Sequence, residues 1–396
     1  MIRQLRPDEV DQFMDMTQVA FAVTFSEDDL KARSKQVVPE QIWGYYLEDR
    51  LAARIAIIPF ETYLEGEKYK MGGIAHVATY PEMRRNGMVG KLMTHSLEVM
   101  RANGQTISML NPFAYGFYRK YGWEWFCDHT TYSMDIQHVP RFKDASGTVK
   151  RGSAADLETI NRIYDQYAMR YNGMLVRTEE WWKSTVLRRK LGSLAMSYDE
   201  AGEPNGYMLY TIRDRKMRIS EFLALSFEGR KSLWQFIANH DSILDKVDFN
   251  SPLNDPVMML VGEPDKVERE YFSYFMFRIV DWQALAGRFR FEKLTPGTEL
   301  LFDLTDEHAS WNSGTWRLVW LSDGGVSVTR LEAEEASACA TAARCKLDIR
   351  TLSAIVCGFR RPSAMAEIGR IHGDAASIAL LERAMPRRLS LIIDMF

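Results

Sequence analysis

The sequence contains little that would indicate a metal centre or a disulfide framework. Its 396 residues include only four cysteines, and none of them has the paired spacing of a zinc site. These cysteines are Cys127, Cys339, Cys345 and Cys357. We therefore expect no metal, and reduced thiols as in a cytoplasmic protein.

Long apolar runs and an excess of positive charge are also missing. No segment approaches the roughly eighteen apolar residues that a membrane span requires, and the first residues contain no apolar signal core. The formal charge is −3 at pH 7, whereas a protein that binds nucleic acid through its surface is usually basic. We therefore expect neither a membrane association nor a nucleic-acid partner.

The chain does have enough apolar material for several hydrophobic cores. Hydrophobic residues make up 46% of it and aromatic residues 12%, which is typical of a folded chain. A length of 396 residues predicts about two or three domains.

One stretch, residues 72–123, organises the interpretation of the whole chain. Residues 74–79 predict a short strand, which Pro81 ends because proline has no amide hydrogen for a ladder. A basic turn follows, Arg84-Arg85-Asn86-Gly87. The next residues predict a helix, because apolar side chains recur there at three- and four-residue steps.

A strand, a basic glycine turn and a helix start can together bind an anion. The first amides of a helix have no partner within it, its dipole adds about half a positive charge, and two arginines add full charges. Gly87 would let the backbone approach a phosphate closely. The spacing fits neither a Walker loop nor a dinucleotide fingerprint. An ordinary strand-to-helix corner with a solvated basic turn is the alternative.

Two segments of this stretch resemble the GNAT acetyltransferases. Arg84-x-x-Gly87 after a strand resembles their pyrophosphate loop, although Val89 departs from the glycine or alanine usual there. Residues 117–123, Phe-Tyr-Arg-Lys-Tyr-Gly-Trp, resemble the family's segment downstream of the cofactor. The resemblance implies a GNAT domain that binds acetyl-CoA as co-substrate.

The rest of the chain predicts two further units. Residues 149–239 repeat the order strand, helix, hairpin, helix, but Ser226 to Lys231 lack the Arg-x-x-Gly turn, which indicates a degenerate GNAT fold serving as scaffold. Three strands and then three helices follow from about residue 298. This order resembles the Eis-type acetyltransferases, whose third domain resembles a sterol carrier protein.

The expected fold class is therefore α+β or α/β: two tandem GNAT folds, each a mixed, mostly antiparallel sheet flanked by helices, and an α+β sterol-carrier-protein-like domain. The expected domains are residues 1–143, 147–286 and 287–396, with the strand at residues 130–136 completing the first. The resemblance also implies a homo-oligomer, such as a hexamer.

The resemblance implies an N-acetyltransferase that moves acetyl from acetyl-CoA to an amine of a cationic small molecule, aminoglycoside- or polyamine-like. Two alternatives stay open. One is a non-catalytic protein that binds acetyl-CoA or an apolar ligand. The other is an acetyltransferase for protein lysines or N-termini.

Two residues are the catalytic candidates that the resemblance implies. Tyr118 matches the general acid, and a phenol with a pKa of about 10 suits a departing thiolate. Its alternative is a half-buried aromatic residue with a satisfied hydroxyl. The carboxylate of Phe396 matches the general base. An ordinary α-carboxyl has a pKa of about 3.5, so burial would have to raise it, or it would act through a water or position the amine.

The remaining site residues are the expected contacts to the cofactor and to the substrate. For the acidic residues Asp28 and Asp29 the alternative is helix capping by Ser26 or Asp28, and for Phe25 and Trp43 it is a place in the core. His76 neighbours Val77 on a strand, so alternation predicts a structural histidine on the other side of the sheet. The expected cofactor contacts are Val77, Ala78, Thr79, Arg84, Arg85, Asn86, Gly87, Met88, Val89, Gly90, Phe113 and Ala114. The expected substrate contacts are Phe25, Asp28, Asp29, Trp43 and Asp394.

Overall fold

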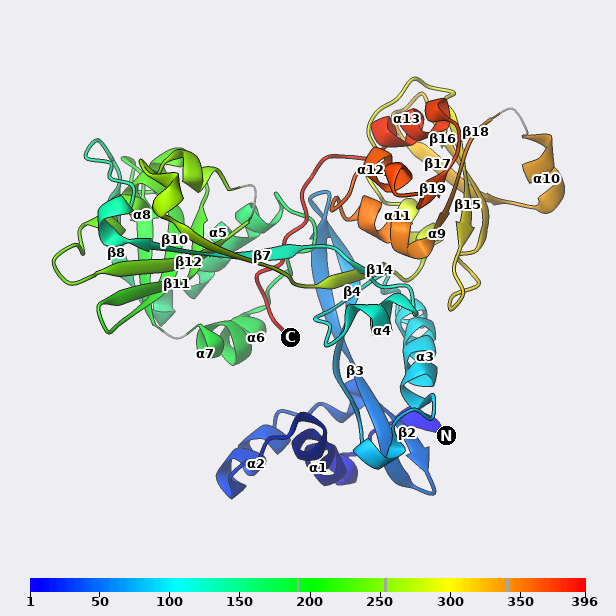
Figure 1. Ribbon diagram of the computed structural model, residues 1–396, viewed down its shortest axis with the longest axis horizontal. Coiled ribbons are helices and arrows are strands. Elements are labelled where there is room, and N and C mark those ends of the chain that lie inside the picture. The colour runs from blue at the N-terminus through cyan, green and yellow to red at the C-terminus, as the bar shows by residue number, and fades with distance from the viewer. Residues whose placement is uncertain (191, 253–254, 340–341) are drawn as a thin grey trace. The chain divides into compact units, whose positions relative to one another are not determined.

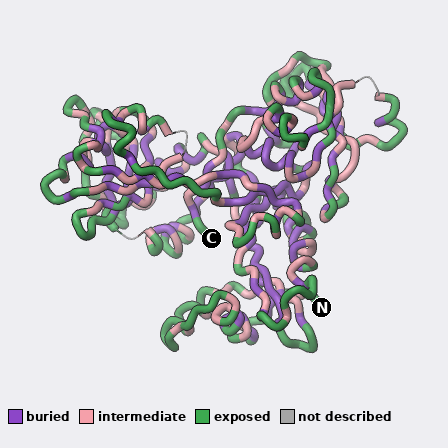
Figure 2. Tube along the Cα trace, viewed as in Figure 1, coloured by how far each residue is buried: buried purple, intermediate pink, exposed green. Residues whose placement is uncertain are grey.

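The computed structural model describes residues 1–396 except 191, 253–254 and 340–341 (Figure 1). The chain divides into two compact units. Unit 1 contains Met1–Phe126, Phe275–Arg388 and Met395–Phe396, and unit 2 contains Cys127–Tyr274 and Leu389–Asp394. The strands of each unit are largely buried, and exposed residues concentrate in the turns and outer helices (Figure 2).

Unit 1 contains a seven-stranded sheet with the order β1-β2-β3-β4-β5-β14-β6. Neighbouring strands are antiparallel except β4 and β5, which are parallel. The strands are β1 (Ile2–Gln4), β2 (Ile42–Leu47), β3 (Arg50–Leu64), β4 (Glu67–Thr79), β5 (Ile107–Leu110), β6 (Glu124–Trp125) and β14 (Met276–Ile279).

Helices cover both faces of this sheet. One face packs against α1, where Phe13 and Met14 meet Ala56 and Ala78. The other face packs against α3, whose residues at three- and four-residue steps join strand residues such as Ile74 in a second cluster. We call these the α1 face and the α3 face. The helices are α1 (Val10–Phe21), α2 (Glu27–Ser34), α3 (Met88–Ala102) and α4 (Tyr115–Arg119).

The C-terminal part of unit 1 forms a five-stranded sheet with the order β17-β16-β15-β18-β19. Its interior is filled by large aromatic side chains, because Trp282, Trp316 and Trp320 are all buried. The strands are β15 (Glu299–Thr305), β16 (Gly314–Trp320), β17 (Val326–Leu331), β18 (Ala343–Asp348) and β19 (Ile371–His372). The helices are α9 (Trp282–Ala286), α10 (Ala333–Ala338), α11 (Ile349–Val356), α12 (Pro362–Glu367) and α13 (Ala375–Ala384).

Unit 2 repeats the sheet of unit 1 strand for strand, in the order β13-β7-β12-β11-β10-β9-β8. Here β11 and β12 are the parallel pair. The strands are β7 (Asp128–Asp135), β8 (Thr148–Gly152), β9 (Ser193–Tyr198), β10 (Pro204–Arg213), β11 (Lys216–Ala224), β12 (Lys246–Ser251) and β13 (Glu268–Ser273). The helices are α5 (Leu157–Ala168), α6 (Glu179–Trp181), α7 (Leu187–Arg189) and α8 (Phe227–Ala238), with a π-helical turn (Trp182–Val186) between α6 and α7.

The strand expected at residues 130–136 forms, but not in the first sheet. It is β7, which pairs with β12 and β13 of unit 2. The corresponding position in unit 1, between β5 and β6, is filled by β14 from much later in the chain. The prediction that residues 130–136 complete the first sheet was therefore wrong. The alternation of a strand predicts its buried face but not its partner, which depends on contacts distant in sequence.

Among the residues that the structure describes, no helix combines the length and the apolar content that crossing a bilayer requires.

Candidate active site

The parallel strands β4 and β5 separate part-way along their length. They pair from Met71 opposite Ile107 to Ile74 opposite Leu110, and in the described residues the pairing stops there. On its other side β4 continues along β3 to Thr79, with a register shift between Arg54 and Ala56. The edge of β4 from residue 75 to 79 therefore faces β5 without a partner strand, and such an edge can hydrogen-bond an extended ligand.

His76 and Val77 face opposite sides of the sheet, as alternation predicted: His76 meets α1, whereas Val77 packs against the core of the α3 face. His76 itself lies at the register shift between β3 and β4, with a φ of 51°. Its side chain is exposed, and its ring meets Phe13 of α1 edge-on at 5.6 Å.

The turn after β4 leads into α3 through a left-handed glycine. Gly87 is the N-cap residue with a φ of 72°, and no described side chain caps the helix. Arg84, Arg85 and Asn86 are exposed, and Arg85 also has a positive φ, 66°. A Cβ at Gly87 would meet nothing within 4 Å. The first amides of α3 therefore face solvent beside two exposed arginine side chains. Such amide and guanidinium donors fit a pyrophosphate.

The first residues of α3 can contribute to such a site only through their backbone. The Met88 side chain is buried and Val89 is half-buried, and both pack in the core of the α3 face. Gly90 has a packing reason of its own, since a Cβ there would come within 2.5 Å of the Tyr121 hydroxyl. The predicted contacts at these three positions are thus backbone contacts.

Tyr118 lies in α4 and is buried in the core of the α3 face. Its ring is flanked edge-on by Phe117 at 5.1 Å and by Phe113 at 5.2 Å. The Phe113 side chain is 70% exposed, and Ala114 beside it is exposed too. Burial raises the pKa of Tyr118 well above the usual value for a phenol. Tyr118 therefore keeps its proton at neutral pH.

The last residue of the chain packs against β3 and β4. The Phe396 ring lies 4.9 Å from the ring of Phe60 and 5.1 Å from that of Phe275. A Cβ at Gly73 would come within 2.9 Å of it, so a glycine makes room for this ring. Phe60 lies four residues after Ala56 on β3 and therefore shares the α1 face. Phe396 and Tyr118 thus approach β4 from opposite faces of the sheet.

Comparisons with known proteins give a family for each of three parts of the chain. Residues 1–126 match a family described as "Acetyltransferase (GNAT) domain", and residues 173–279 match a second family with the same description. Residues 283–392 match "Sterol carrier protein domain".

Curated relatives of this chain are N-acetyltransferases by name. An uncharacterized N-acetyltransferase of Streptomyces coelicolor is 22% identical, over 78% of this chain and 76% of its own. N-acetyltransferase Eis of Mycobacterium tuberculosis is 23% identical over 48% of this chain and 50% of its own. Among solved structures, a probable N-acyltransferase from Enterococcus faecalis has a TM-score of 0.89 and 26% identity, covering 100% of this chain and 99% of that one. Eis1 from Mycobacterium abscessus has a TM-score of 0.81 and 17% identity, covering both chains completely.

The chain belongs to the Eis-type GNAT acetyltransferases.

The expected fold class is confirmed: two tandem GNAT folds precede a sterol-carrier-protein-like domain. The chain is an acetyl-CoA-dependent N-acetyltransferase, as its GNAT domains and the names of its relatives indicate. The uncapped α3 helix and the open edge of β4 belong to the first GNAT domain, which also carries Tyr118.

The predicted substrate residues of this GNAT domain do not all lie together. Phe25 is half-buried against the core of the α1 face, with the Arg33 guanidinium 4.3 Å above its ring. Asp28 and Asp29 are exposed in the first turn of α2, and Asp29 accepts a hydrogen bond from Ser26, the cap of that helix. Trp43 lies on the α3 face instead, where its ring meets His95 at 4.5 Å. Phe25 and Trp43 are therefore on opposite sides of the sheet.

Asp394 lies away from any surface. It belongs to unit 2, is 2% exposed, and accepts hydrogen bonds at 3.1 Å from the Nε of Arg177. Because its charge is buried and paired, Asp394 does not face an entrance as we expected.

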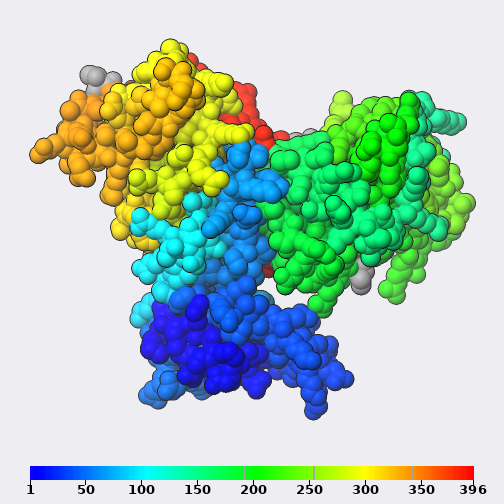
Figure 3. All heavy atoms as spheres, turned by 180° about the vertical axis from the view of Figure 1, so that it is seen from behind, coloured from blue at the N-terminus to red at the C-terminus, as the bar shows by residue number. Residues whose placement is uncertain are grey.

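An acidic hollow on the α1 side of the first GNAT domain was not anticipated from the sequence. It has a volume of 520 Å³, and Tyr80, one of its lining residues, directly follows Thr79 of β4. The N-terminal helices, dark blue in Figure 3, cover this side of the sheet. Two features of the sequence could have indicated the hollow. Asp11 and Asp15 are four residues apart on α1, and Glu48 and Asp49 form an acidic turn. The hollow is lined by Asp11, Gln12, Asp15, Glu48, Asp49, Arg50 and Tyr80.

Proposed function

We propose that this enzyme transfers the acetyl group of acetyl-CoA to an amino group of a cationic small molecule, aminoglycoside- or polyamine-like. The observation that carries the proposal is the combination on β4: an open strand edge ends beside an uncapped helix start with two exposed arginines. The arginines and α3 amides would bind the pyrophosphate, and the edge of β4 at residues 77–79 would bind the pantetheine arm.

Tyr118 and the terminal carboxylate are assigned the two proton transfers. The carboxylate of Phe396 takes a proton from the substrate ammonium, and the neutral nitrogen then attacks the thioester carbon. A C–N bond forms, the C–S bond breaks, and Tyr118 gives its proton to the leaving thiolate. The second proton that the nitrogen loses restores the phenol, so the products are the amide and free CoA.

The preference for a cationic acceptor is supported by charge. Four carboxylates and one arginine line the hollow next to the end of β4, and the exposed acidic residues of α2 lie on the same face of the sheet. Such a surface raises the local concentration of polycations and does so less in high salt.

The decisive experiment measures CoA release across a panel of amines, with the protein carrying its native terminus. The panel contains aminoglycosides, polyamines and lysine peptides. We expect turnover with the first two classes, and Asp49→Asn should raise the KM for the amine while the KM for acetyl-CoA stays constant. Turnover with lysine peptides alone would replace this substrate class with protein amines. Acetyl-CoA binding without CoA release for any amine would indicate a binding protein.

A further inference from the structure

The second GNAT fold repeats the separated strands of the first. In unit 2 the parallel pairing of β11 with β12 ends at Ile219 opposite Phe249. A register shift with β10 follows immediately, between Leu209 and Tyr210. Glu221 is the first β11 residue after that shift to pair with β10, opposite Leu209. Its place corresponds to the open edge of β4 in the first fold.

In the second fold, the helix start that corresponds to the predicted pyrophosphate site is capped by a side chain. Ser226 caps α8, its hydroxyl accepting a hydrogen bond from the Gly229 amide at 3.1 Å, and Glu228 adds negative charge in the first turn. The corresponding helix α3 has an exposed glycine at its cap and no described capping side chain. A pyrophosphate would meet an occupied amide and a carboxylate at α8, so the start of α8 does not repeat the anion site of α3.

A buried ion-pair network fills the position next to the separated strands. Glu221 accepts hydrogen bonds from Arg177, at 2.5 Å from Nη2 and 3.2 Å from Nη1, and from Lys190 at 2.5 Å. The Tyr207 hydroxyl donates to it at 2.6 Å. Burial alone would raise the pKa of Glu221, but attraction to Arg177 and Lys190 outweighs it and lowers the pKa to about 2.

Arg177 joins this network to the end of the chain. Its Nε donates to both carboxylate oxygens of Asp394 at 3.1 Å, and its guanidinium lies over the ring of Tyr164, at 3.9 Å, and that of Trp182, at 4.4 Å. Asp394 also accepts hydrogen bonds from the Tyr164 hydroxyl at 3.2 Å and from the Trp181 indole at 3.0 Å. These partners of Asp394 come from α5 and from the segment around α6.

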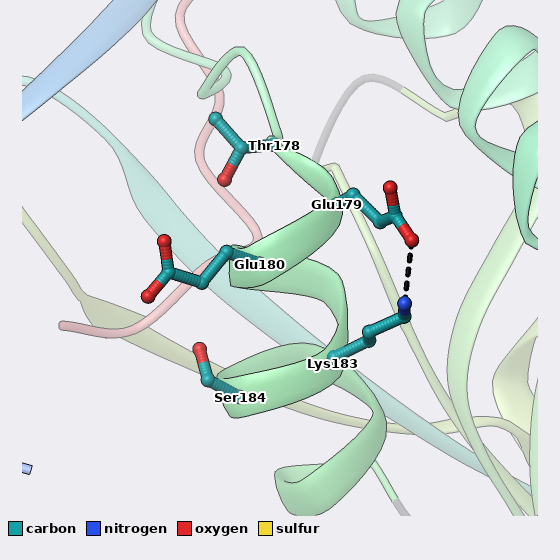
Figure 4. A pocket seen from close by; sticks show the side chains of 5 residues that line it. All are labelled: Thr178, Glu179, Glu180, Lys183 and Ser184. Atoms are coloured by element: carbon teal, nitrogen blue, oxygen red, sulfur yellow. Dashed lines mark hydrogen bonds and ion pairs between the residues drawn. The ribbon is translucent and has the colours of Figure 1, made fainter.

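The backbone of the terminal segment is held as well. The Asn172 amide donates to Leu389, and the Leu391 amide donates to Asn172, both at 2.8 Å. The Lys190 ammonium donates to the carbonyl of Ile393 at 3.0 Å. The segment, faint red in Figure 4, passes behind the helix that carries Glu180 and Ser184. The outer side of that helix lines an open surface hollow of 670 Å³.

We propose that the second GNAT fold is a peptide socket that binds the chain's own terminal segment, Leu389–Asp394, and that Arg177 is the positioning residue that holds it there. The site that binds a thioester in one copy of the fold thus binds a peptide carboxylate in the other. Net charge supports the assignment: the cations Arg177 and Lys190 face the anions Glu221 and Asp394, and without Asp394 one buried positive charge has no partner. The catalytic consequence, through Phe396 two residues later, rests on the proposed function.

Amide hydrogen exchange of the full-length protein tests the socket without any substrate. In Asp394→Asn, which keeps the shape of the side chain but removes its charge, we expect the Leu391 amide to exchange at least tenfold faster. Arg177→Met should have the same effect. The matched control is Arg215→Met, which breaks an exposed ion pair with Asp245 in the same unit and should leave Leu391 protected.

Unchanged protection of Leu391 in folded Asp394→Asn would overturn the proposal. That variant decides the question if Arg177→Met does not fold. Steady-state kinetics then separate the two proposals: both variants should lower kcat and leave the KM for acetyl-CoA constant. If the Leu391 amide exchanges faster but kcat is unchanged, the peptide socket is supported and the proposed role of Phe396 is contradicted.

Discussion

Tyr118 combines a buried ring with a proton that is hard to remove. Its position between Phe113 and Phe117 takes the hydroxyl out of bulk water, which disfavours the phenolate and raises the pKa. A general acid must be protonated when the thiolate leaves, and Tyr118 meets that requirement over the whole working range of pH.

Tyr118→Phe should lower kcat by roughly 10²- to 10⁴-fold while the KM for acetyl-CoA changes little, because only the proton donor is lost. Since the pKa is raised, the wild-type kcat should not fall from ionisation of this phenol up to a pH of about 10. Tyr115→Phe, in the same short helix, is the control and should stay near wild type. Steady-state kinetics between pH 6 and about 10 check both statements. A fully active Tyr118→Phe would exclude Tyr118 as the acid.

Glu221 makes the stability of unit 2 depend on pH in a defined direction. Its pKa in the folded protein, about 2, is below that of an ordinary glutamate, so its ionised form stabilises the fold. This contribution is complete above a pH of about 4.5 and is lost as the pH falls toward 2. Glu221→Gln should therefore lower the melting temperature of the protein strongly at pH 7 and much less at pH 3. Equal losses at both pH values would contradict this assignment.

At the scale of elements, the two ends of α3 provide a matched pair of glycines. Gly87 precedes the helix with a φ of 72°, and Gly104 follows it with a φ of 69°. A Cβ would meet nothing within 4 Å at either position. The two sites therefore have the same backbone strain and the same free space, but only Gly87 lies in the basic turn.

Alanine at either glycine should cost roughly 1–2 kcal/mol of stability, because the left-handed conformation disfavours a Cβ. Only Gly87→Ala should also raise the KM for acetyl-CoA, because the turn must shift and the α3 amides move with it. Thermal melting and acetyl-CoA titration of both variants measure the two effects. A similar KM for both variants would place the pyrophosphate elsewhere.

At the scale of the whole molecule, the proposed general base is the carboxylate of Phe396. The ring of that residue packs against Phe60, Phe275 and Gly73 in unit 1, while Leu389–Asp394 belongs to unit 2. An added residue would convert the terminal carboxylate into an amide, which cannot accept a proton.

Extending the chain by a few glycines and serines past Phe396 should therefore abolish acetyl transfer, with acetyl-CoA affinity retained. The same residues added before Met1, which is 68% exposed, are the control and should leave activity unchanged. CoA release and acetyl-CoA titration of both proteins give the answer. A fully active C-terminal extension would exclude the carboxylate as the base.

The sequence by itself determined the features that depend on neighbours along the chain. The turn 84–87 is predictable because a proline-ended strand, two arginines and a glycine before an amphipathic helix define a local geometry. Most helices and the longer strands follow from the same kind of local periodicity. The repeated order of elements was enough to predict the second GNAT fold.

The tertiary structure alone decided which distant segments meet. Strand β14 was not predicted, and β7 was assigned to the wrong sheet, because the partner of a strand is chosen by contacts far away in sequence. The bulge in β4 at His76 was not predicted either, although His76 and Val77 do face opposite sides of the sheet as expected. Asp394, expected at an entrance, is buried because Arg177, more than two hundred residues earlier, neutralises it. A charge in the sequence reveals its sign, but only the folded chain determines whether that charge faces solvent or a partner.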